Sequence, residues 1–200
     1  AYTMTAAHPH NADQYCEAVE ERILTFIPNE KVIAIGEAGL DFFYNLSEKD
    51  NQIRVFKRQI QIAKSHNLFL TVHSREAEAL VLDILEREKF DLPVVFHCYT
   101  GNIENAKRII DRGYYISFSG IITFRQKKTE YLREIVKMVP INQILSETDA
   151  PYLAPEPHRG KTNSPINVRH VAEKIAELKN LPVQESNAAI KENIERLIRQ

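Results

Sequence analysis

Four potential metal ligands stand at or shortly after the ends of short apolar runs, where predicted strands end. They are Glu37, His73, His97 and Asp149. Imidazole nitrogen combined with carboxylate oxygen suits Zn²⁺, Mn²⁺ or Mg²⁺, and a set without thiolates is typical of an open, catalytic centre. A single His, Glu or Asp at a strand end is more often a structural or surface group than a ligand. The pattern alone therefore leaves open whether the chain is a metal hydrolase.

The elements that position these residues alternate between strands and helices. Apolar runs predict strands at 32–35, 68–72, 94–96, 114–118 and 143–145, and a weaker strand within 2–7. Segments of helical period separate them or follow them, at about 47–66, 79–85, 103–113, 131–140, 164–178 and from 190 onward. Ser47 and Asp50 look like a capping box at the first of these helices. This alternation predicts parallel strands joined by crossover helices.

We expect one α/β domain over residues 1–200, of the (β/α)8 TIM-barrel type. An open dinucleotide-binding sheet is disfavoured because no G-x-G-x-x-G follows a strand. In a barrel the carboxyl ends of the strands meet at one mouth, so the four candidate ligands would converge there. The barrel thus explains why ligand-type residues recur at strand ends.

Composition excludes several classes of protein. The 200 residues are 44% hydrophobic and 26% charged, which excludes a disordered chain, and no apolar run is long enough to span a membrane. The formal net charge of −1 gives no global positive field that would attract nucleic acid. Two cysteines, Cys16 and Cys98, are too few for a disulfide framework and fit a reducing compartment, so we expect a cytoplasmic protein that does not bind membranes.

Five sequence blocks, in order, resemble the signature blocks of the TatD family of metal-dependent deoxyribonucleases. The blocks are Gly36-Glu37-Ala38-Gly39-Leu40-Asp41, His73-Ser74-Arg75, His97-Cys98-Tyr99-Thr100-Gly101, Glu147-Thr148-Asp149-Ala150-Pro151-Tyr152-Leu153-Ala154-Pro155 and His158-Arg159-Gly160-Lys161-Thr162-Asn163. The resemblance runs from about Ala7 to the final helix. It implies a barrel that uses one or two divalent cations, Mg²⁺, Mn²⁺ or Zn²⁺, to hydrolyse phosphodiester bonds in DNA as a 3′-5′ exonuclease.

The resemblance also implies a role for each ligand. Glu37 matches the glutamate that bridges two metals, and His73 and His97 match the histidines that complete one metal's ligands with it. Asp149 matches the aspartate that binds the other metal and orients the attacking water. A carboxylate at that position can accept the proton of the water, so Glu37 and Asp149 are the predicted catalytic residues.

Other residues are predicted to bind the DNA substrate. Arg75 lies two residues after His73 and so shares its direction along a strand, where it can bind a phosphate oxygen; a rim salt bridge is the alternative. His8 matches the first histidine of the family's H-P-H block. His158, Arg159 and Lys161 lie in a proline-rich loop after Asp149 and are candidates for contacts with the nucleic-acid backbone. Tyr99 and Tyr152 are candidates for base stacking or for simple packing.

One family feature is absent from this chain. No His-x-His ends a strand before Glu37 except His8-Pro9-His10, which matches a different block, and six predicted strands are two short of eight. We therefore expect an N-terminally truncated barrel without its first two βα units. Such a chain would hold the second metal weakly, and its open sheet edges predict self-association where a full barrel would be monomeric.

Two other functions stay open at this stage. The same strand-end ligands serve hydrolases of small phosphoesters, amides or esters. A catalytically impaired fragment that keeps one metal site is the alternative that the missing ligand pair favours. Arg75 and the basic loop favour a polyanionic substrate.

Overall fold

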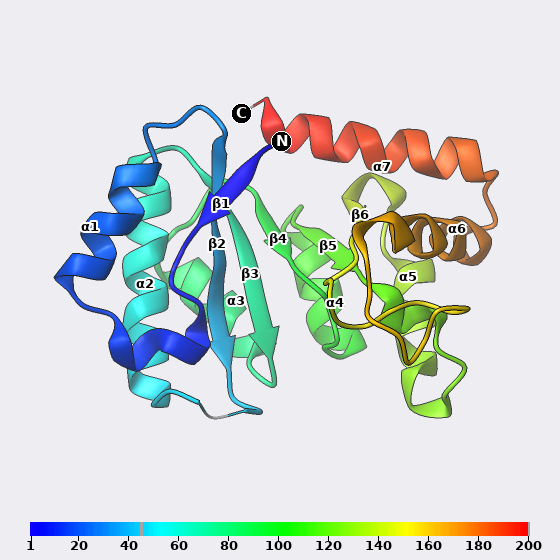
Figure 1. Cartoon of the computed structure of the whole chain (residues 1–200), viewed down its shortest axis with the longest axis horizontal. Coiled ribbons are helices and arrows are strands. Elements are labelled where there is room, and N and C mark those ends of the chain that lie inside the picture. The colour runs from blue at the N-terminus through cyan, green and yellow to red at the C-terminus, as the bar shows by residue number, and fades with distance from the viewer. Residues whose placement is uncertain (45, 200) are drawn as a thin grey trace. The chain divides into compact units, whose positions relative to one another are not determined.

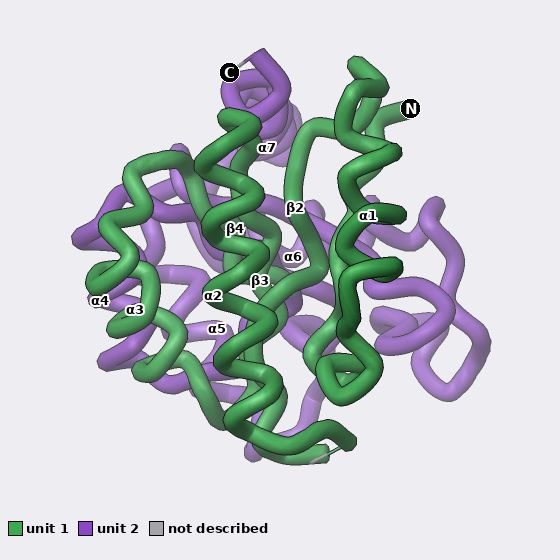
Figure 2. The backbone as a smooth tube through the Cα atoms, turned by 90° about the vertical axis from the view of Figure 1, so that its left-hand side faces the viewer, with its two compact units in different colours: residues 1–97, 200 green, residues 98–199 purple. Residues whose placement is uncertain are grey.

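The structure is a computed structural model that describes residues 1–44 and 46–199. The chain divides into two compact units, residues 1–97 and 98–199, shown in separate colours in Figure 2. Each unit combines parallel strands with helices. The α/β class predicted from the sequence is therefore confirmed.

Unit 1 is built on four parallel strands, hydrogen-bonded in the order β1-β2-β3-β4 (Figure 1). They are β1 (Thr3–Thr5), β2 (Val32–Asp41), β3 (Phe69–Arg75) and β4 (Val94–Phe96). β2 and β3 are almost wholly buried, as central strands of a parallel sheet should be. Of the predicted site residues, these two strands carry Glu37, His73 and Arg75.

Helices pack against these strands. They are the 3₁₀ helix η1 (Pro9–Gln14), α1 (Glu17–Phe26), α2 (Lys49–Ser65) and α3 (Glu78–Arg87). α2 and α3 each contact β2 and β3. α2 buries one apolar face, with Val55, Phe56 and Ile60 at most 1% exposed, because these residues recur at helical spacing. α1 lies beside α2, where the Arg58 guanidinium pairs with the Glu20 carboxylate (Figure 1).

Unit 2 contains the parallel pair β5 (Tyr115–Phe118) and β6 (Ile144–Ser146). Its helices are α4 (Ile103–Asp111), α5 (Glu130–Met138), α6 (Val168–Lys179) and α7 (Val183–Ile198), with the 3₁₀ turns η2 (Gly120–Thr123), η3 (Lys127–Thr129), η4 (Ile141–Gln143) and η5 (Pro165–Asn167). α6 and α7 pack on each other and on β6, and α4 packs on β5. None of the helices in the described part of the chain is both long and apolar enough to cross a membrane.

The predicted capping box at Ser47 is wrong. α2 begins at Lys49, and Glu48 at the N-cap position makes no side-chain capping bond. The Ser47 hydroxyl instead donates to the His10 carbonyl oxygen at 2.8 Å, and the Glu48 N–H donates to the Asp13 carboxylate at 3.0 Å. Ser47 therefore ties the start of α2 to η1, a long-range contact that local sequence does not reveal.

Candidate metal centre

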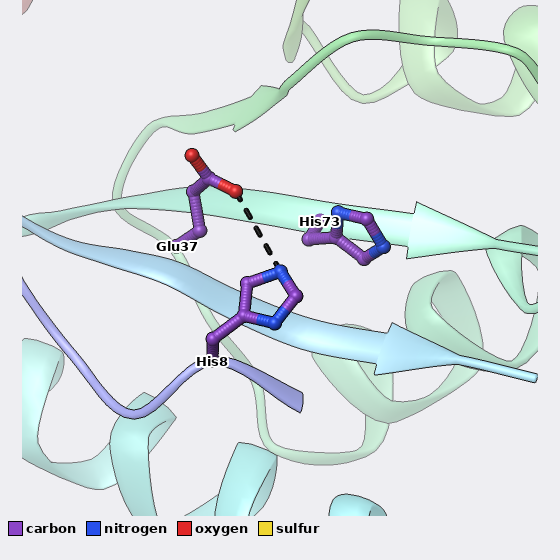
Figure 3. Close-up of side chains that lie close together, drawn as sticks. All are labelled: His8, Glu37 and His73. Carbon is purple, nitrogen blue, oxygen red and sulfur yellow. Dashed lines mark ion pairs between the residues drawn. The ribbon is translucent and has the colours of Figure 1, made fainter. Parts of the chain in front are cut away.

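Glu37 lies in a bulge of β2. Strand pairing passes from Ile35 opposite Leu70 to Ala38 opposite Val72, so β2 has one residue more than β3 across this step. A bulge turns a side chain away from the regular alternation of the strand, and bulges are common beside active sites. The Glu37 carboxylate points toward His8 and His73 (Figure 3).

Two imidazoles face the same oxygen of Glu37. Oε2 of Glu37 lies 3.7 Å from Nε2 of His8 and 3.6 Å from Nε2 of His97. His97 follows β4 directly, and its backbone N–H donates to the Val72 carbonyl oxygen at 3.0 Å. The strand order therefore brings together residues that are far apart in the sequence.

Gly39 lets β2 approach β3 at the level of His73. The two residues are paired across the strands. Gly39 has a φ of +140°, and a Cβ built there would lie 2.0 Å from the His73 carbonyl oxygen. Only glycine fits both the backbone conformation and the space, so Gly39 is required for the position of His73.

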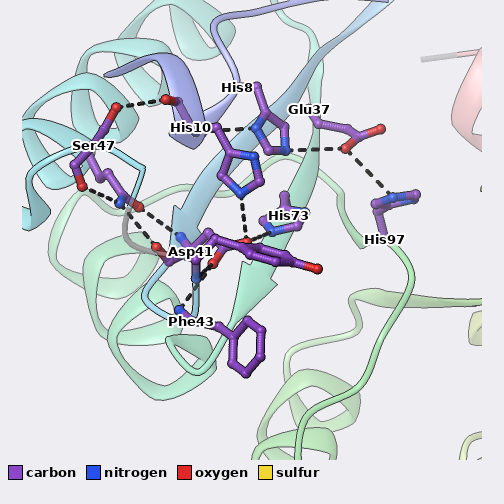
Figure 4. A network of polar contacts seen from close by, with 10 residues as sticks. His8, His10, Glu37, Asp41, Phe43, Ser47, His73 and His97 are labelled. Atoms are coloured by element: carbon purple, nitrogen blue, oxygen red, sulfur yellow. Dashed lines mark hydrogen bonds and ion pairs between the residues drawn. The ribbon is translucent and has the colours of Figure 1, made fainter. Parts of the chain in front are cut away.

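His73 and His10 both bond to one buried carboxylate, Asp41 (Figure 4). Asp41 ends β2 and is 0% exposed. Its Oδ2 lies 2.8 Å from Nε2 of His73 and 2.9 Å from Nε2 of His10. Its Oδ1 accepts the backbone N–H groups of Phe43, at 3.1 Å, and Tyr44, at 2.9 Å. Both oxygens are thus fully used.

Gln52 of α2 fixes the backbone of Asp41. Its amide oxygen accepts the Asp41 N–H at 2.8 Å, and its amide nitrogen donates to the carbonyl oxygens of Asp41, at 3.0 Å, and Ser47, at 2.9 Å. The side chain is buried, at 1% exposure. Because buried polar groups are costly when unpaired, Gln52 locks the end of β2 against α2.

These bonds decide which ring nitrogens carry hydrogen. An ionised carboxylate only accepts, so Nε2 of His73 carries the hydrogen and Nδ1 keeps a free electron pair for a cation. His8 is the same tautomer, but its Nδ1 electron pair is already used, because Nδ1 accepts the His10 N–H at 3.2 Å. Neutral His8 therefore presents an N–H from Nε2 toward Glu37, which makes it a donor rather than a ligand.

Burial and hydrogen bonding shift the pKa values of these groups. Burial alone raises the pKa of Asp41, but the bonds from Tyr44, His10 and His73 outweigh it and lower that pKa to about 2. Burial, with the neighbouring charges of His73 and His10, lowers the pKa of His8 to about 4. Burial also lowers the pKa of His73, against the opposing effect of Asp41. At neutral pH the site holds an anionic Asp41 and neutral His8 and His73.

The residues around Glu37 fit a divalent cation. Two ligands bound at 2.0–2.1 Å to a tetrahedral ion lie roughly 3.4 Å apart, close to the 3.6 Å between Oε2 of Glu37 and Nε2 of His97, which is longer than a hydrogen bond. Ligand atoms of His8, Glu37 and His73 lie within 4.8 Å of one another, as do those of His10, Asp41 and His73. Hydrogen bonds to Asp41 join the members of the second group, so the atoms around Glu37 are the candidate site for a cation.

Arg75 is the last residue of β3, and its guanidinium rests on two aromatic rings. The guanidinium carbon lies 4.0 Å from the ring centre of Phe43 and 4.7 Å from that of Tyr44. The rim salt bridge considered as an alternative is not among the ion pairs of the described residues. The contact of Arg75 with a phosphate oxygen remains a prediction.

The other predicted residues belong to unit 2. Asp149 follows β6 with a φ of +54°, and its Oδ2 lies 4.0 Å from Sγ of Cys98. The His158 ring lies 5.3 Å from the His170 ring, Arg159 stacks on Phe124 at 4.4 Å, and Lys161 is exposed. The place of Asp149 beside Glu37 and the roles of the basic loop stay predictions.

The sequence pattern does not indicate that Asp41 and His10 belong to the site. Asp41 ends the Gly36–Asp41 block, six residues beyond the predicted end of β2 at Ile35, and carries no predicted role. The available signal is its position four residues after Glu37 on the same strand, which places it near the same strand-end region. His10 takes part through its bond to Asp41.

Parallel strands, crossover helices and a His-carboxylate centre at strand ends define an α/β metal-dependent hydrolase. The chain belongs to the TatD family, because the model of the TatD-related DNases matches residues 1–199. The uncharacterised metal-dependent hydrolase YcfH of Escherichia coli K12 is 44% identical over 191 residues, which cover 95% of this chain and 71% of YcfH.

Two further relatives support this assignment. The 3′-5′ ssDNA/RNA exonuclease TatD of Shigella flexneri is 36% identical over 180 residues, or 88% of this chain and 69% of that protein. The crystal structure of the TatD homologue YjjV from E. coli K12 matches with a TM-score of 0.91 at 26% identity, over 100% of this chain and 77% of YjjV. The predicted TIM-barrel type of fold is confirmed.

Proposed function

We propose that this hydrolase is a nuclease that cleaves phosphodiester bonds in single-stranded DNA from the 3′ end. The observation that carries the proposal is the Glu37 oxygen, which His97 approaches at 3.6 Å beside the free Nδ1 of His73. The relative in Shigella flexneri that bears the name of a 3′-5′ exonuclease supports the choice of substrate. RNA is the second polymer in that name and belongs in the same test.

Glu37, His73 and His97 would hold the first cation, which we propose to be Mg²⁺, Mn²⁺ or Zn²⁺. A second cation would use Glu37 and Asp149. When bound, a divalent cation stabilises negative charge on the phosphate and makes a nearby water more acidic. Asp149 would accept a proton from the attacking water, as a carboxylate near that water can.

His8 would bind the substrate rather than the cation. Because Nδ1 of His8 accepts a backbone N–H, Nε2 offers its hydrogen to a phosphate oxygen at the side of Glu37. Arg75, His158, Arg159 and Lys161 would add positive charge for the phosphates on either side of the cleaved bond. A neutral donor at His8 keeps the site able to hold a cation, because no positive imidazolium stands next to it.

The test uses single-stranded DNA and RNA labelled at the 3′ or the 5′ end, with Mg²⁺ or Mn²⁺. We expect the 3′ label to be released first as single nucleotides, and Glu37→Gln and Asp149→Asn to abolish release. Lys107→Gln, a surface change in α4, is the control. Hydrolysis of a small phosphoester, amide or ester without cleavage of either polymer would instead favour a small-molecule hydrolase. Bound metal without any hydrolysis would mark a chain that keeps only one metal site.

A further inference from the structure

Two aromatic side chains stand exposed just beyond β2. Phe43 and Tyr44 are each 51% exposed, and their ring centres lie 5.0 Å apart at an interplanar angle of 87°. Neighbouring exposed rings form an apolar surface that a ligand can cover. We call Phe43, Tyr44 and the guanidinium of Arg75 the aromatic platform.

The platform is held in place before any ligand arrives. The backbone N–H groups of Phe43 and Tyr44 both donate to Oδ1 of Asp41. The Arg75 guanidinium lies over both rings, an attractive contact between a cation and the ring faces. The His10 and Tyr44 rings lie nearly perpendicular to each other, with their centres 5.5 Å apart. Binding on this surface would therefore lose little conformational entropy.

The platform is also attached to the metal centre. Asp41 binds the platform backbone through Oδ1 and the His73 ring through Oδ2. The His10 ring lies between the two regions, 5.5 Å from Tyr44 and 5.8 Å from His73. Asp41 follows Glu37 by four residues on β2, and His73 contacts Asp41 and has a ligand atom within 4.8 Å of Glu37. A nucleic acid bound at Glu37 therefore has the platform close beside it.

We propose that the aromatic platform stacks a nucleobase of the single strand, close to the cleaved phosphate. This inference rests on the proposed nuclease function and names the part of the substrate that the platform binds. Every base has an aromatic face, so stacking on exposed rings is strong and tolerant of sequence. The guanidinium at the rings supplies the positive charge that the adjoining phosphate requires.

The arrangement differs from the stacking candidates suggested by the sequence. Tyr99 is 2% exposed and its hydroxyl donates to the Asn102 carbonyl oxygen at 2.7 Å, so it serves packing. Tyr152 is 70% exposed but belongs to unit 2. Phe43 and Tyr44 combine exposure, a cation and a shared bond to Asp41, which is the combination expected of a base-binding surface.

Binding is measured by fluorescence anisotropy, with Mg²⁺ and phosphorothioate oligonucleotides that resist cleavage. One oligonucleotide carries bases, and a second of equal length carries abasic tetrahydrofuran sugars. We expect Tyr44→Ala and Phe43→Ala to weaken binding of the first by roughly 5- to 100-fold, as loss of one stacked base does. Binding of the abasic strand should stay within twofold. Phe26→Ala, which removes an exposed ring from α1, is the matched control.

A second measurement needs no variant. A 2-aminopurine near the 3′ end loses fluorescence when it stacks on an aromatic ring, and the wild-type protein should quench it. Where an alanine variant unfolds more readily than wild type, Tyr44→Leu replaces it, because leucine keeps apolar area and removes the ring. Turnover should show a raised KM for DNA with kcat little changed.

The outcomes separate the two proposals. In one outcome the wild-type protein cleaves DNA while the two alanine variants lose equal affinity for both oligonucleotides or lose none. That result would overturn base stacking on the platform and leave the nuclease function standing. Wild type that neither binds nor cleaves either polymer would overturn the nuclease and the platform together. Equal weakening by Phe26→Ala would show a general apolar effect and would also overturn the platform.

Discussion

Replacing Asp41 with asparagine should weaken cation binding although Asp41 is not one of the proposed ligands. The amide oxygen of the new side chain can still accept the N–H groups of Phe43 and Tyr44, so its amide nitrogen then faces Nε2 of His10 and His73. Two donors cannot bond to each other. To keep a bond, His73 must move its hydrogen from Nε2 to Nδ1, which removes the electron pair that the cation needs.

Two magnitudes follow from this exchange. Loss of a partner that orients a metal-binding histidine typically costs 10- to 100-fold in metal affinity, and we expect that range for Asp41→Asn. Two bonds to a charged acceptor, about 1.5 to 3 kcal/mol each, become neutral bonds of about 1 kcal/mol each. The unfolding free energy of the metal-free protein should therefore fall by roughly 1 to 4 kcal/mol.

Isothermal titration with Mn²⁺ or Zn²⁺ measures the affinity, urea unfolding measures the stability, and ¹⁵N NMR of the imidazoles reports which nitrogen is protonated. Asp91→Asn, an exposed change in the same unit, is the control. The NMR spectrum of wild type should show hydrogen on Nε2 of His73. Unchanged metal affinity in Asp41→Asn, or hydrogen on Nδ1 of His73 in metal-free wild type, would show that Asp41 does not set the tautomer of His73.

Three further predictions concern the scaffold of the site. Gly39→Ala should lower the unfolding free energy by about 2 to 4 kcal/mol in urea titrations, because the added Cβ meets the His73 carbonyl and φ is +140°; an effect under about 0.5 kcal/mol would contradict this. Gln52→Leu leaves three buried backbone groups at Asp41 and Ser47 without partners, so a loss of at least about 2 kcal/mol is expected, whereas a neutral result would mean that water replaces the amide. Burial lowers the pKa of His8 in the folded, metal-free protein to about 4, below the pKa of about 6.5 in an unfolded chain. Between pH 4 and pH 6.5 the unfolded state therefore binds more protons than the folded state. Stability should then fall as pH drops from 6.5 to 4, by at most about 3 kcal/mol, and His8→Asn should flatten that part of a pH series of urea unfolding curves.

The strands can be predicted because their apolar runs are continuous, as buried parallel strands require. All six strands occur near the predicted positions, and His73 and His97 lie at the end of β3 and just after β4 as expected. β2 extends to Asp41 because Gly36, Ala38 and Gly39 allow close strand contact. Small residues of this kind resemble a turn in sequence, so the apolar pattern predicts a strand that stops at Ile35.

The missed features depend on contacts between distant residues. The sequence pattern does not predict α1, because Ile23 is its one buried residue and it lacks a strong apolar face. Ser47 looks like a cap but bonds to His10, which is 37 residues earlier. Asp41, His10 and His73 become one network only when η1, β2 and β3 meet. No local pattern encodes that meeting, whereas a ligand type at a strand end is visible in the sequence.

We propose that His73 and His97 hold a divalent cation together with Glu37. X-ray absorption at the zinc edge, measured on the zinc-loaded wild-type protein and on His97→Asn, detects the atoms bound to the metal. The wild-type spectrum should show nitrogen and oxygen neighbours with the scattering of two imidazole rings, and the His97→Asn spectrum should show one ring fewer. A zinc–sulfur neighbour, or a wild-type spectrum without imidazole scattering, would contradict this proposal.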